Sequence, residues 1–257
     1  MNAEAEHILA VGLEAVTRAE KIILAHYKTG LQSTQKQDGS PVTIADQKAE
    51  ETIRSVVGAA FPTHGFIGEE FATDNQKAVY QWIIDPIDGT KNFMRGVPFF
   101  TTELAVFKNG VPYMGISNIP TLGLTVTAVQ GHGARVSRRR VSVSTTARLE
   151  DAYIIVGGLK HFNNLKHIEQ LLKLTSDVMS LKSLGEAWSY HLLAQGNCDA
   201  VIEAQTKIWD IAAQSMIIPE AGGIVTDIAG KPIDLNSTSM LASTPILHKE
   251  LLVYFAQ

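Results

Sequence analysis

An apolar run that stops at two aspartates constrains this chain more than any other stretch. The run Val79–Ile84 predicts a buried strand, and Asp85 and Asp88 follow it, with Pro86 between them. Because proline has no backbone N–H, we expect Pro86 to end the hydrogen-bond ladder of the strand and to leave both carboxylates on a loop. Two carboxylates this close repel each other unless a cation lies between them. The stretch therefore predicts a divalent metal site at a strand end.

The two residues after Asp88 add a place for a phosphate group. Gly89 lets the backbone approach a ligand closely, and Thr90 offers a hydroxyl and an N–H group. Backbone N–H groups at such a turn suit an anion. The Asp85–Thr90 stretch thus predicts a metal site with a phosphate-sized pocket beside it.

Acidic residues also stand at the boundaries of other expected elements. Asp46 lies at the start of a helix, Glu69–Glu70 follows a short apolar strand, and Asp210 begins an apolar helix. An ionised acid is costly inside an apolar layer, so we expect these side chains to face a cleft. If they converge, a site built only from oxygen ligands favours Mg²⁺ or Mn²⁺ over Zn²⁺. The eight histidines show no spacing that would supply a competing site.

Apolar periodicity divides the chain into two halves. The first half predicts two helices followed by a mainly antiparallel sheet, and the second predicts strands that alternate with helices. The expected class is α/β to α+β, with layers of helix and sheet. A chain of 257 residues can form one large domain over residues 1–257, made of two packed lobes at about 1–145 and 146–257.

Turn and cap signals set the expected bounds of the elements. Asn109–Gly110 predicts a hairpin turn, Asp38–Pro41 a turn, and Thr244 before Pro245 the start of a C-terminal helix. The expected helices are 5–28, about 45–60, 163–174, about 186–195, 211–221 and one that starts at 245. The expected strands are 66–68, 79–84, 101–107, 111–116, 124–129, 135–143, 152–156, 178–181, 198–202 and 224–226.

Charge and composition exclude several functional classes. The formal net charge is −4, so no nucleic-acid partner is expected, and we interpret the run Arg138–Arg140 as a solvated loop. Cys198 is the only cysteine, which precludes an internal disulfide and fits a reducing compartment. No apolar run reaches the roughly 18 residues of a membrane span, and the N-terminus lacks the features of a signal peptide. We therefore expect a cytoplasmic protein with no membrane partner.

Several blocks that occur in register resemble the inositol monophosphatase family. They are Pro41–Asp46, Phe66–Glu70, Trp82–Phe93, Trp209–Ala213 and Glu220–Gly223, and the similarity covers essentially the whole chain. The resemblance implies a layered αβαβα sandwich of the inositol monophosphatase and fructose-1,6-bisphosphatase type. It also implies a homodimeric, Mg²⁺-dependent phosphatase that hydrolyses a small phosphate monoester with a metal-activated water.

By the same resemblance, individual residues take separate roles. The implied ligands of two Mg²⁺ ions, for which Mn²⁺ can substitute and beside which a weaker third ion is allowed, are Glu69, Asp85, the Ile87 carbonyl, Asp88 and Asp210. The implied catalytic residues are Asp46 and Thr90, which activate the water, and Glu70, which helps to orient or deprotonate it. The phosphate is expected on the N–H groups of Gly89 and Thr90.

The alcohol part of the substrate depends on a later segment. Glu186, Ala187 and Glu203 match the substrate-facing positions of the family. The acid at position 186 and the neighbouring Trp188–Tyr190 resemble the histidinol-phosphate phosphatase branch, and an additional carboxylate suits a cationic substrate. Histidinol phosphate is the leading expectation and inositol 1-phosphate the alternative. Adenosine 3',5'-bisphosphate or a sugar phosphate follows them.

Simpler interpretations stay open for some of these residues. Glu186 could be a solvent-facing acid at a helix start, and Asp46 could serve only to cap a helix. Lys36 could close over the active site or lie on the surface. Because some relatives bind partner proteins, a protein-binding regulatory member without catalytic activity is the alternative from another class. No metal ligand of the family is missing from this chain, which favours the enzyme.

Overall fold

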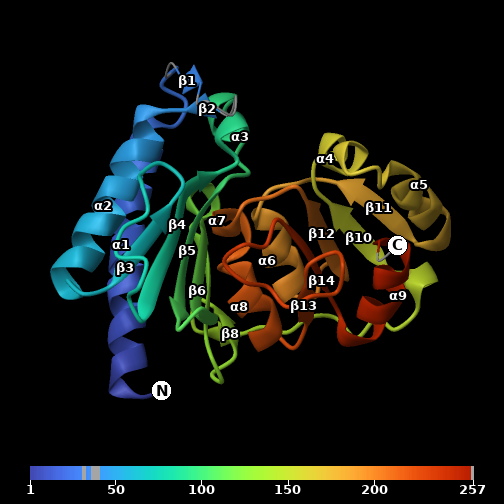
Figure 1. The fold of residues 1–257 in the computed structure, drawn as a ribbon. Coiled ribbons are helices and arrows are strands. Elements are labelled where there is room, and N and C mark those ends of the chain that lie inside the picture. The colour runs from blue at the N-terminus through green and yellow to red at the C-terminus, as the bar shows by residue number, and fades with distance from the viewer. Residues whose placement is uncertain (31–32, 36–40, 256–257) are drawn as a thin grey trace.

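The structure, a computed structural model, describes residues 1–30, 33–35 and 41–255. Layers of helix and sheet alternate across the molecule, with helices outside both sheets and between them (Figure 1). This αβαβα order confirms the expected fold class. Lys36 and most of the turn expected at 38–41 lie outside the described residues.

The first sheet follows the order of the chain. Among the described residues its strand order is β3-β4-β5-β6-β7-β8-β9, in which β3 and β4 are parallel and the other neighbours are antiparallel. The strands are β3 (Gly65–Gly68), β4 (Tyr80–Asp88), β5 (Thr101–Lys108), β6 (Val111–Ile119), β7 (Leu124–Val129), β8 (Ala134–Val136) and β9 (Arg139–Arg140). Asn109 and Gly110 both have positive φ and form the predicted turn between β5 and β6.

Two long helices cover the outer face of the first sheet. They are α1 (Ala3–His26) and α2 (Ile44–Ala60), and a small hairpin of β1 (Thr34–Gln35) and β2 (Pro41–Val42) lies beside them (Figure 1). Alternate residues of β4 face opposite sides, so Trp82 and Ile84 pack with these helices while Ile83 faces the middle of the molecule. This alternation explains why the whole run is apolar: the strand is buried on both faces.

The second sheet is mixed. Its strand order among the described residues is β11-β10-β12-β14-β13, with β10 parallel to β11 and β12, and β14 antiparallel to β12 and β13. The strands are β10 (Tyr153–Val156), β11 (Ser180–Ser183), β12 (Ala200–Ala204), β13 (Ile224–Thr226) and β14 (Ser239–Ser243). Its outer face packs against α4 (Leu159–Asn164), α5 (Ile168–Asp177) and α9 (Pro245–Phe255).

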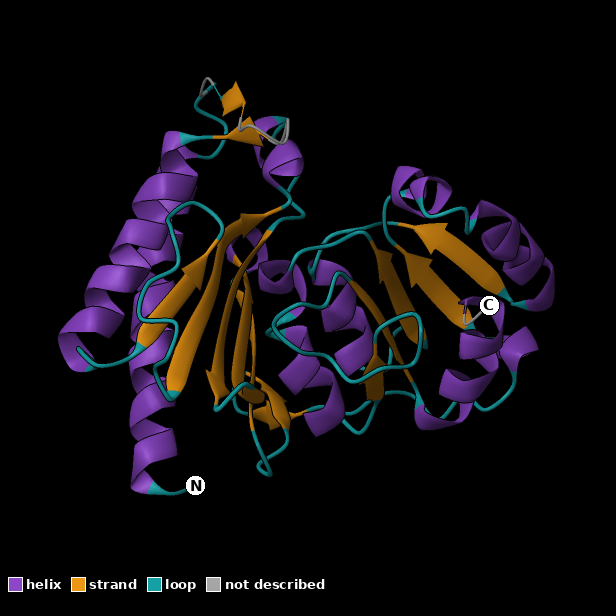
Figure 2. Cartoon of the chain, viewed as in Figure 1, coloured by secondary structure: helices purple, strands orange, loops and turns teal. Residues whose placement is uncertain are grey.

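Short helices fill the space between the two sheets. These are α6 (Trp188–Ala194), α7 (Ile208–Ile211) and α8 (Gln214–Glu220), shown in purple between the orange strands in Figure 2. One apolar core joins Ile83 of the first sheet, Met216 of α8 and Val201 of the second sheet. This shared core supports our proposal that residues 1–257 form one domain of two packed lobes. No helix among the described residues is long and apolar enough to cross a bilayer.

Several predicted bounds are wrong, and the backbone shows why. The helix expected at 163–174 is two helices, because Lys166 between them adopts a left-handed φ of 61°. The helix expected from 186 begins at Trp188, because Glu186 has a φ of 63°. The helix expected at 211–221 is divided between α7 and α8. At this division the Ala213 backbone packs closely on β6, and a Cβ on Gly115 would lie 2.5 Å from the Ala213 oxygen.

Candidate active site

The predicted end of the strand before Asp85 is wrong: β4 continues to Asp88. Asp85 lies opposite Glu103 of β5 and Asp88 opposite Thr101, so the register shifts by one residue across Pro86. This is a β-bulge, and Pro86 is tolerated in it because β3 pairs with β4 only as far as Ile84. The bulge lets both aspartates project from a strand in place of a free loop.

Three carboxylates converge at the end of β4. Asp85, Asp88 and Asp210 each offer an oxygen atom that lies within 4.8 Å of the oxygen atoms offered by the other two. Asp85 is buried, and its Oδ1 atom has no hydrogen-bond partner among the described residues. Burial, with the charges of Glu69, Asp88 and Asp210, raises the pKa of Asp85 well above its usual range. Unpaired oxygen ligands around a buried centre fit a hard divalent cation.

Backbone and hydroxyl donors hold the other two carboxylates in place. Asp210 Oδ2 accepts hydrogen bonds from Thr206 Oγ1 at 2.6 Å and from the Lys207 N–H at 2.8 Å, at the start of α7. Asp88 Oδ2 accepts a short hydrogen bond from the Ala187 N–H, which comes from the second half of the chain. Burial raises the pKa of both aspartates, and neighbouring carboxylates add to the shift of Asp88. The three carboxylates therefore come from two elements, β4 and α7, and a third segment, at Ala187, supplies a donor to Asp88.

Glu69 and Glu70 lie directly after β3, as predicted. The Glu69 N–H donates to the Ile84 oxygen at 3.1 Å, which extends the pairing of β3 with β4 by one bond. The charge of Glu69 contributes to raising the pKa values of both Asp46 and Asp85, so it acts on both groups. Glu69 is not among the three carboxylates whose oxygen atoms converge most closely.

Asp46 caps α2 and also reaches Thr90. Its Oδ2 atom accepts from the Thr43 N–H at 2.8 Å, which is one half of a capping box at the start of α2, and also from Thr43 Oγ1 at 2.5 Å. Its Oδ1 atom lies 3.4 Å from Thr90 Oγ1, whose single proton can go either to this carboxylate or to the Ile87 oxygen at 3.1 Å. Burial raises the pKa of Asp46, against the lowering effect of the Thr43 hydrogen bonds. The two interpretations of Asp46 are therefore compatible, because separate oxygen atoms serve them.

Gly89 and Thr90 form the turn between β4 and α3 (Thr90–Met94). Gly89 has a left-handed φ of 88°, and a Cβ there would lie 3.3 Å from a carboxylate oxygen of Glu186. The N–H groups at the start of a helix have no carbonyl partner within it, and no Gly89 side chain shields them. The turn thus presents backbone donors next to the acidic cluster, as the phosphate prediction requires.

A cavity of about 370 Å³ opens beside the acidic cluster. Asp88, Asp210, Glu186, Ala187 and Glu203 all line it. Glu186 is half-buried, so it is not the freely solvated helix-start acid of the simpler interpretation. Neither the Glu186 nor the Glu203 carboxylate forms a hydrogen bond or ion pair with any described residue.

Burial raises the pKa of Glu203 to about 8, and the charges of Glu186 and Asp210 add to this shift. Glu203 packs over Gly157, where a Cβ would overlap its carboxylate. The cavity therefore holds two unpaired acids near each other, in addition to the three convergent aspartates.

Further cavity residues were not predicted from the sequence. Lys91, Lys160, His161, Tyr190 and Gln205 line the same space. Lys91 follows the phosphate turn directly, so its position in the chain could have identified it. The other residues come from α4, α6 and the end of β12, and only the fold brings them together.

Tyr190 is distinct among these residues. Its side chain is buried, and its hydroxyl has no hydrogen-bond partner among the described residues. Burial raises its pKa well above the usual range, and the charges of Glu203, Asp88 and Asp210 add to this effect. An unpaired phenol in an acidic wall is a polar group for which a ligand or a water molecule can provide the partner.

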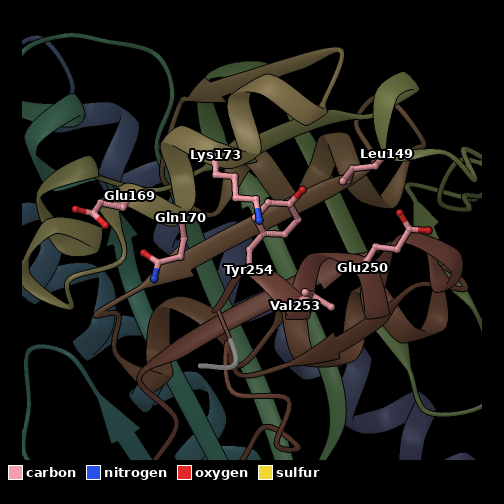
Figure 3. A pocket seen from close by; sticks show the side chains of 7 residues that line it. All are labelled: Leu149, Glu169, Gln170, Lys173, Glu250, Val253 and Tyr254. Carbon is pink, nitrogen blue, oxygen red and sulfur yellow. The ribbon is translucent and has the colours of Figure 1, made fainter.

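A second cavity of about 620 Å³ shares no lining residue with the first. It lies between α5 and α9, and Lys173, Tyr254 and Glu250 project into it (Figure 3). The Lys173 ammonium lies 5.6 Å from the centre of the Tyr254 ring, and the Tyr254 hydroxyl donates to Asp177 at 2.5 Å. Lys173 and Tyr254 thus have partners, in contrast to Glu186 and Glu203, so the acidic cavity is the candidate active site.

Comparison with known proteins identifies the relatives of this chain. A sequence model of the inositol monophosphatase family matches residues 4–257. A Mycobacterium tuberculosis protein named histidinol-phosphatase is 34% identical over 250 residues, which cover 95% of this chain and 96% of that protein. A Mesorhizobium japonicum protein named inositol-1-monophosphatase is 33% identical over 227 residues, which cover 86% and 85% of the two chains. The solved structure of the extragenic suppressor protein SuhB from Bartonella henselae superposes with a TM-score of 0.90 at 29% identity, over 98% of this chain and 99% of that one.

Proposed function

The chain belongs to the inositol monophosphatase family and is a phosphoric monoester hydrolase; within this class, we propose that it depends on Mg²⁺ and acts on histidinol phosphate. The observation that carries the substrate proposal is the pair Glu186 and Glu203, two carboxylates that line the cavity without a partner. Histidinol carries an amine, and such a cation would give the two acids the partner that they lack. A neutral polyol would leave them desolvated and unpaired.

The residues around Asp85 would hold the cations. Glu69, Asp85, the Ile87 carbonyl, Asp88 and Asp210 are the proposed ligands of two ions, and Mn²⁺ suits the same oxygen atoms. Glu69 is also the proposed contact of a weaker third ion. When bound, the cations offset the charge of the phosphate and make a water molecule easier to ionise.

The chain's own residues then prepare the attacking water. Thr90 Oγ1 lies between the Asp46 carboxylate and the Ile87 oxygen, so it can accept a hydrogen bond from water while it donates to Asp46. Because burial raises the pKa of Asp46, this carboxylate takes up a proton more readily than an exposed aspartate. Glu70, whose backbone is fixed next to Glu69, is the proposed helper that orients or deprotonates the water. The Gly89 and Thr90 N–H groups would hold the phosphate oxygens.

The reaction has a direct test. Purified wild-type protein should release inorganic phosphate from histidinol phosphate only when Mg²⁺ or Mn²⁺ is present. Asp88→Asn, which keeps the shape of a proposed ligand and removes its charge, should lose the activity. Wild-type protein that binds no divalent cation and hydrolyses no phosphate ester would contradict the proposal.

The substrate has a separate test. We expect kcat/KM for histidinol phosphate to exceed that for inositol 1-phosphate by at least about tenfold, because an unpaired buried charge is costly. Adenosine 3',5'-bisphosphate and a sugar phosphate should be poorer still. A preference for inositol 1-phosphate would transfer the proposal to that ester and leave the reaction class intact.

We also propose a homodimer in the cytoplasm. Exposed apolar side chains at Val97, Phe99 and Leu122 support the dimer, and a hydrogen bond from the Thr121 hydroxyl to the Pro98 oxygen joins the two loops that carry them. Cys198 is buried and unpaired, in keeping with a reducing compartment. Light scattering of the purified protein in solution measures the assembly.

A further inference from the structure

Glu50 is a fully buried carboxylate to which the proposed reaction gives no role. It lies on α2 one turn after Asp46, and its side chain has no exposed surface. One carboxylate oxygen, Oε1, accepts from Arg54 Nε at 2.8 Å. The other, Oε2, accepts from the Glu70 N–H at 2.8 Å. Glu50 therefore connects α2 to the backbone at Glu70, directly after the proposed ligand Glu69.

The residue before Glu69 is shaped to admit this carboxylate. Gly68 ends β3, and a Cβ at that position would overlap Glu50 Oε1 and lie 2.8 Å from Arg54 Nη2. The glycine thus lets a charged pair of α2 lie directly against the last residue of the strand. This close approach explains a glycine at the start of the Gly68–Glu70 segment.

Arg54 extends the connection along the loop. Its Nη2 atom donates to the Phe71 oxygen at 3.1 Å and to the Ala72 oxygen at 3.3 Å. Its guanidinium also pairs with Asp74 at 3.4 Å and lies 5.3 Å from the centre of the Phe66 ring. The pair therefore fixes the backbone on both sides of the segment that carries Glu69 and Glu70.

We propose that the Glu50–Arg54 pair positions the Glu69–Glu70 segment for binding of the divalent cation. One rigid helix then carries Asp46 and also sets the place of Glu69, so the groups that act on water and cation keep a constant separation. Neither Glu50 nor Arg54 touches the substrate; both act through the backbone of residues 70–72. The inference rests on the proposed function in that Glu69 is taken as a metal ligand.

The expected effect is large enough to measure. Removing a group that holds a metal ligand in place typically weakens metal binding by about 10- to 100-fold. A buried ion pair, in contrast, can often be replaced by apolar side chains of similar volume with little loss of stability. Metal affinity and stability should therefore separate in a variant that replaces both partners.

The test uses the double variant Glu50→Met/Arg54→Met of the full chain. Calorimetric titration of the metal-free protein with Mn²⁺ measures affinity without reference to turnover, and thermal unfolding measures stability. We expect Mn²⁺ binding at least tenfold weaker than in wild type, with a melting temperature close to the wild-type value. The matched control is Glu14→Met/Arg18→Met, an exposed pair on α1 with the same spacing of four residues, which should leave Mn²⁺ binding unchanged.

Single variants test the hydrogen bond to Glu70. Glu50→Gln keeps an acceptor oxygen for the Glu70 N–H, so it should bind Mn²⁺ more tightly than Glu50→Ala. Equal affinities in these two variants, or wild-type affinity in the double variant, would overturn the inference while wild-type cation binding and phosphate release keep the proposed function. Wild-type protein that binds no Mn²⁺ would contradict both the inference and the proposed function.

Discussion

The two sides of the acidic cavity differ in how their charges are held. On the cation side, formed by Asp85, Asp88 and Asp210, hydrogen bonds from the chain hold Asp88 and Asp210 and orient their carboxylates. On the alcohol side, formed by Glu186 and Glu203, neither carboxylate forms a hydrogen bond or salt bridge within the described chain; burial raises the pKa of Glu186, and the charge of Lys91 only partly offsets this. The carboxylates of the cation side are therefore oriented before any ligand binds, whereas those of the alcohol side gain a charged partner only when a cationic substrate binds. The reaction follows from the first side and the choice of ester from the second.

The largest predicted effect comes from removing the charge of one carboxylate on the cation side. Asp85→Asn removes the charge from a buried carboxylate whose pKa is raised by burial and by the neighbouring acids. We expect kcat/KM to fall by about 10³-fold or more, since a lost ion site costs several kcal/mol of transition-state stabilisation. The metal-free variant should be more stable than metal-free wild type, because one repelling charge is gone. Thermal unfolding with and without Mg²⁺ tests this, and a destabilised metal-free variant would contradict it.

The next effect concerns the alcohol side. Glu203→Gln keeps the volume of the side chain but cannot ionise, so the cationic substrate loses the carboxylate whose ionised form its own charge would favour. We expect kcat/KM for histidinol phosphate to fall by about 10- to 100-fold, the usual range for a hydrogen bond to a charged group. Phenyl phosphate, which carries no cation, serves as the control substrate and should be hydrolysed at the wild-type rate. Equal losses on both esters would place Glu203 on the cation side.

Stability of the metal-free protein should fall as the pH rises. Burial raises the pKa of both Glu103 and Glu203 to about 8 from an ordinary value of 4.5, so the folded state binds protons that the unfolded state releases. Their contribution is complete below about pH 4.5 and is lost as the pH approaches 8. Urea unfolding between pH 5 and 8 in the presence of a chelator measures the slope. Glu203→Gln should flatten this slope, and an unchanged slope would contradict the assignment.

The smallest effect concerns Tyr190. Its hydroxyl is buried without a partner, so Tyr190→Phe should leave the free energy of unfolding unchanged or raise it by about 1 kcal/mol. Tyr254→Phe is the matched control, because it removes a hydroxyl that donates to Asp177, and it should not raise stability. A clear loss of stability in Tyr190→Phe, measured by urea unfolding, would show that the hydroxyl has a partner in the free protein.

Most of the cation side could be predicted because one stretch of the chain carries two of its three carboxylates. The order Asp85, Asp88, Gly89, Thr90 already contains two ligands and the phosphate turn, and the layered fold follows from the apolar periodicity. The prediction that the strand ends before Asp85 was wrong, because a bulge beyond the end of β3 allows Pro86 to remain in β4. Local sequence signals cannot show that β3 stops pairing with β4 at Ile84, and this is the condition that allows Pro86.

The alcohol side could be predicted only in part. Glu186 was found by resemblance, but its φ of 63°, its place over Gly89 and its lack of a partner depend on tertiary contacts. Trp188–Tyr190 was noted by resemblance, but the burial of the Tyr190 hydroxyl without a partner depends on tertiary contacts. The same holds for Glu50, because its partner Glu70 lies 20 residues away and its proposed role depends on the packing of α2 against β3.

The most direct test of the division between the two sides is the ester preference of Glu186→Gln. Glutamine is the suitable replacement, because a β-branched residue would be strained at a φ of 63°. We predict that the ratio of kcat/KM for histidinol phosphate to that for inositol 1-phosphate falls by at least about tenfold, while the Mg²⁺ concentration needed for half-maximal activity stays constant. An unchanged ratio, or a ratio that favours the inositol ester already in wild type, would contradict the account.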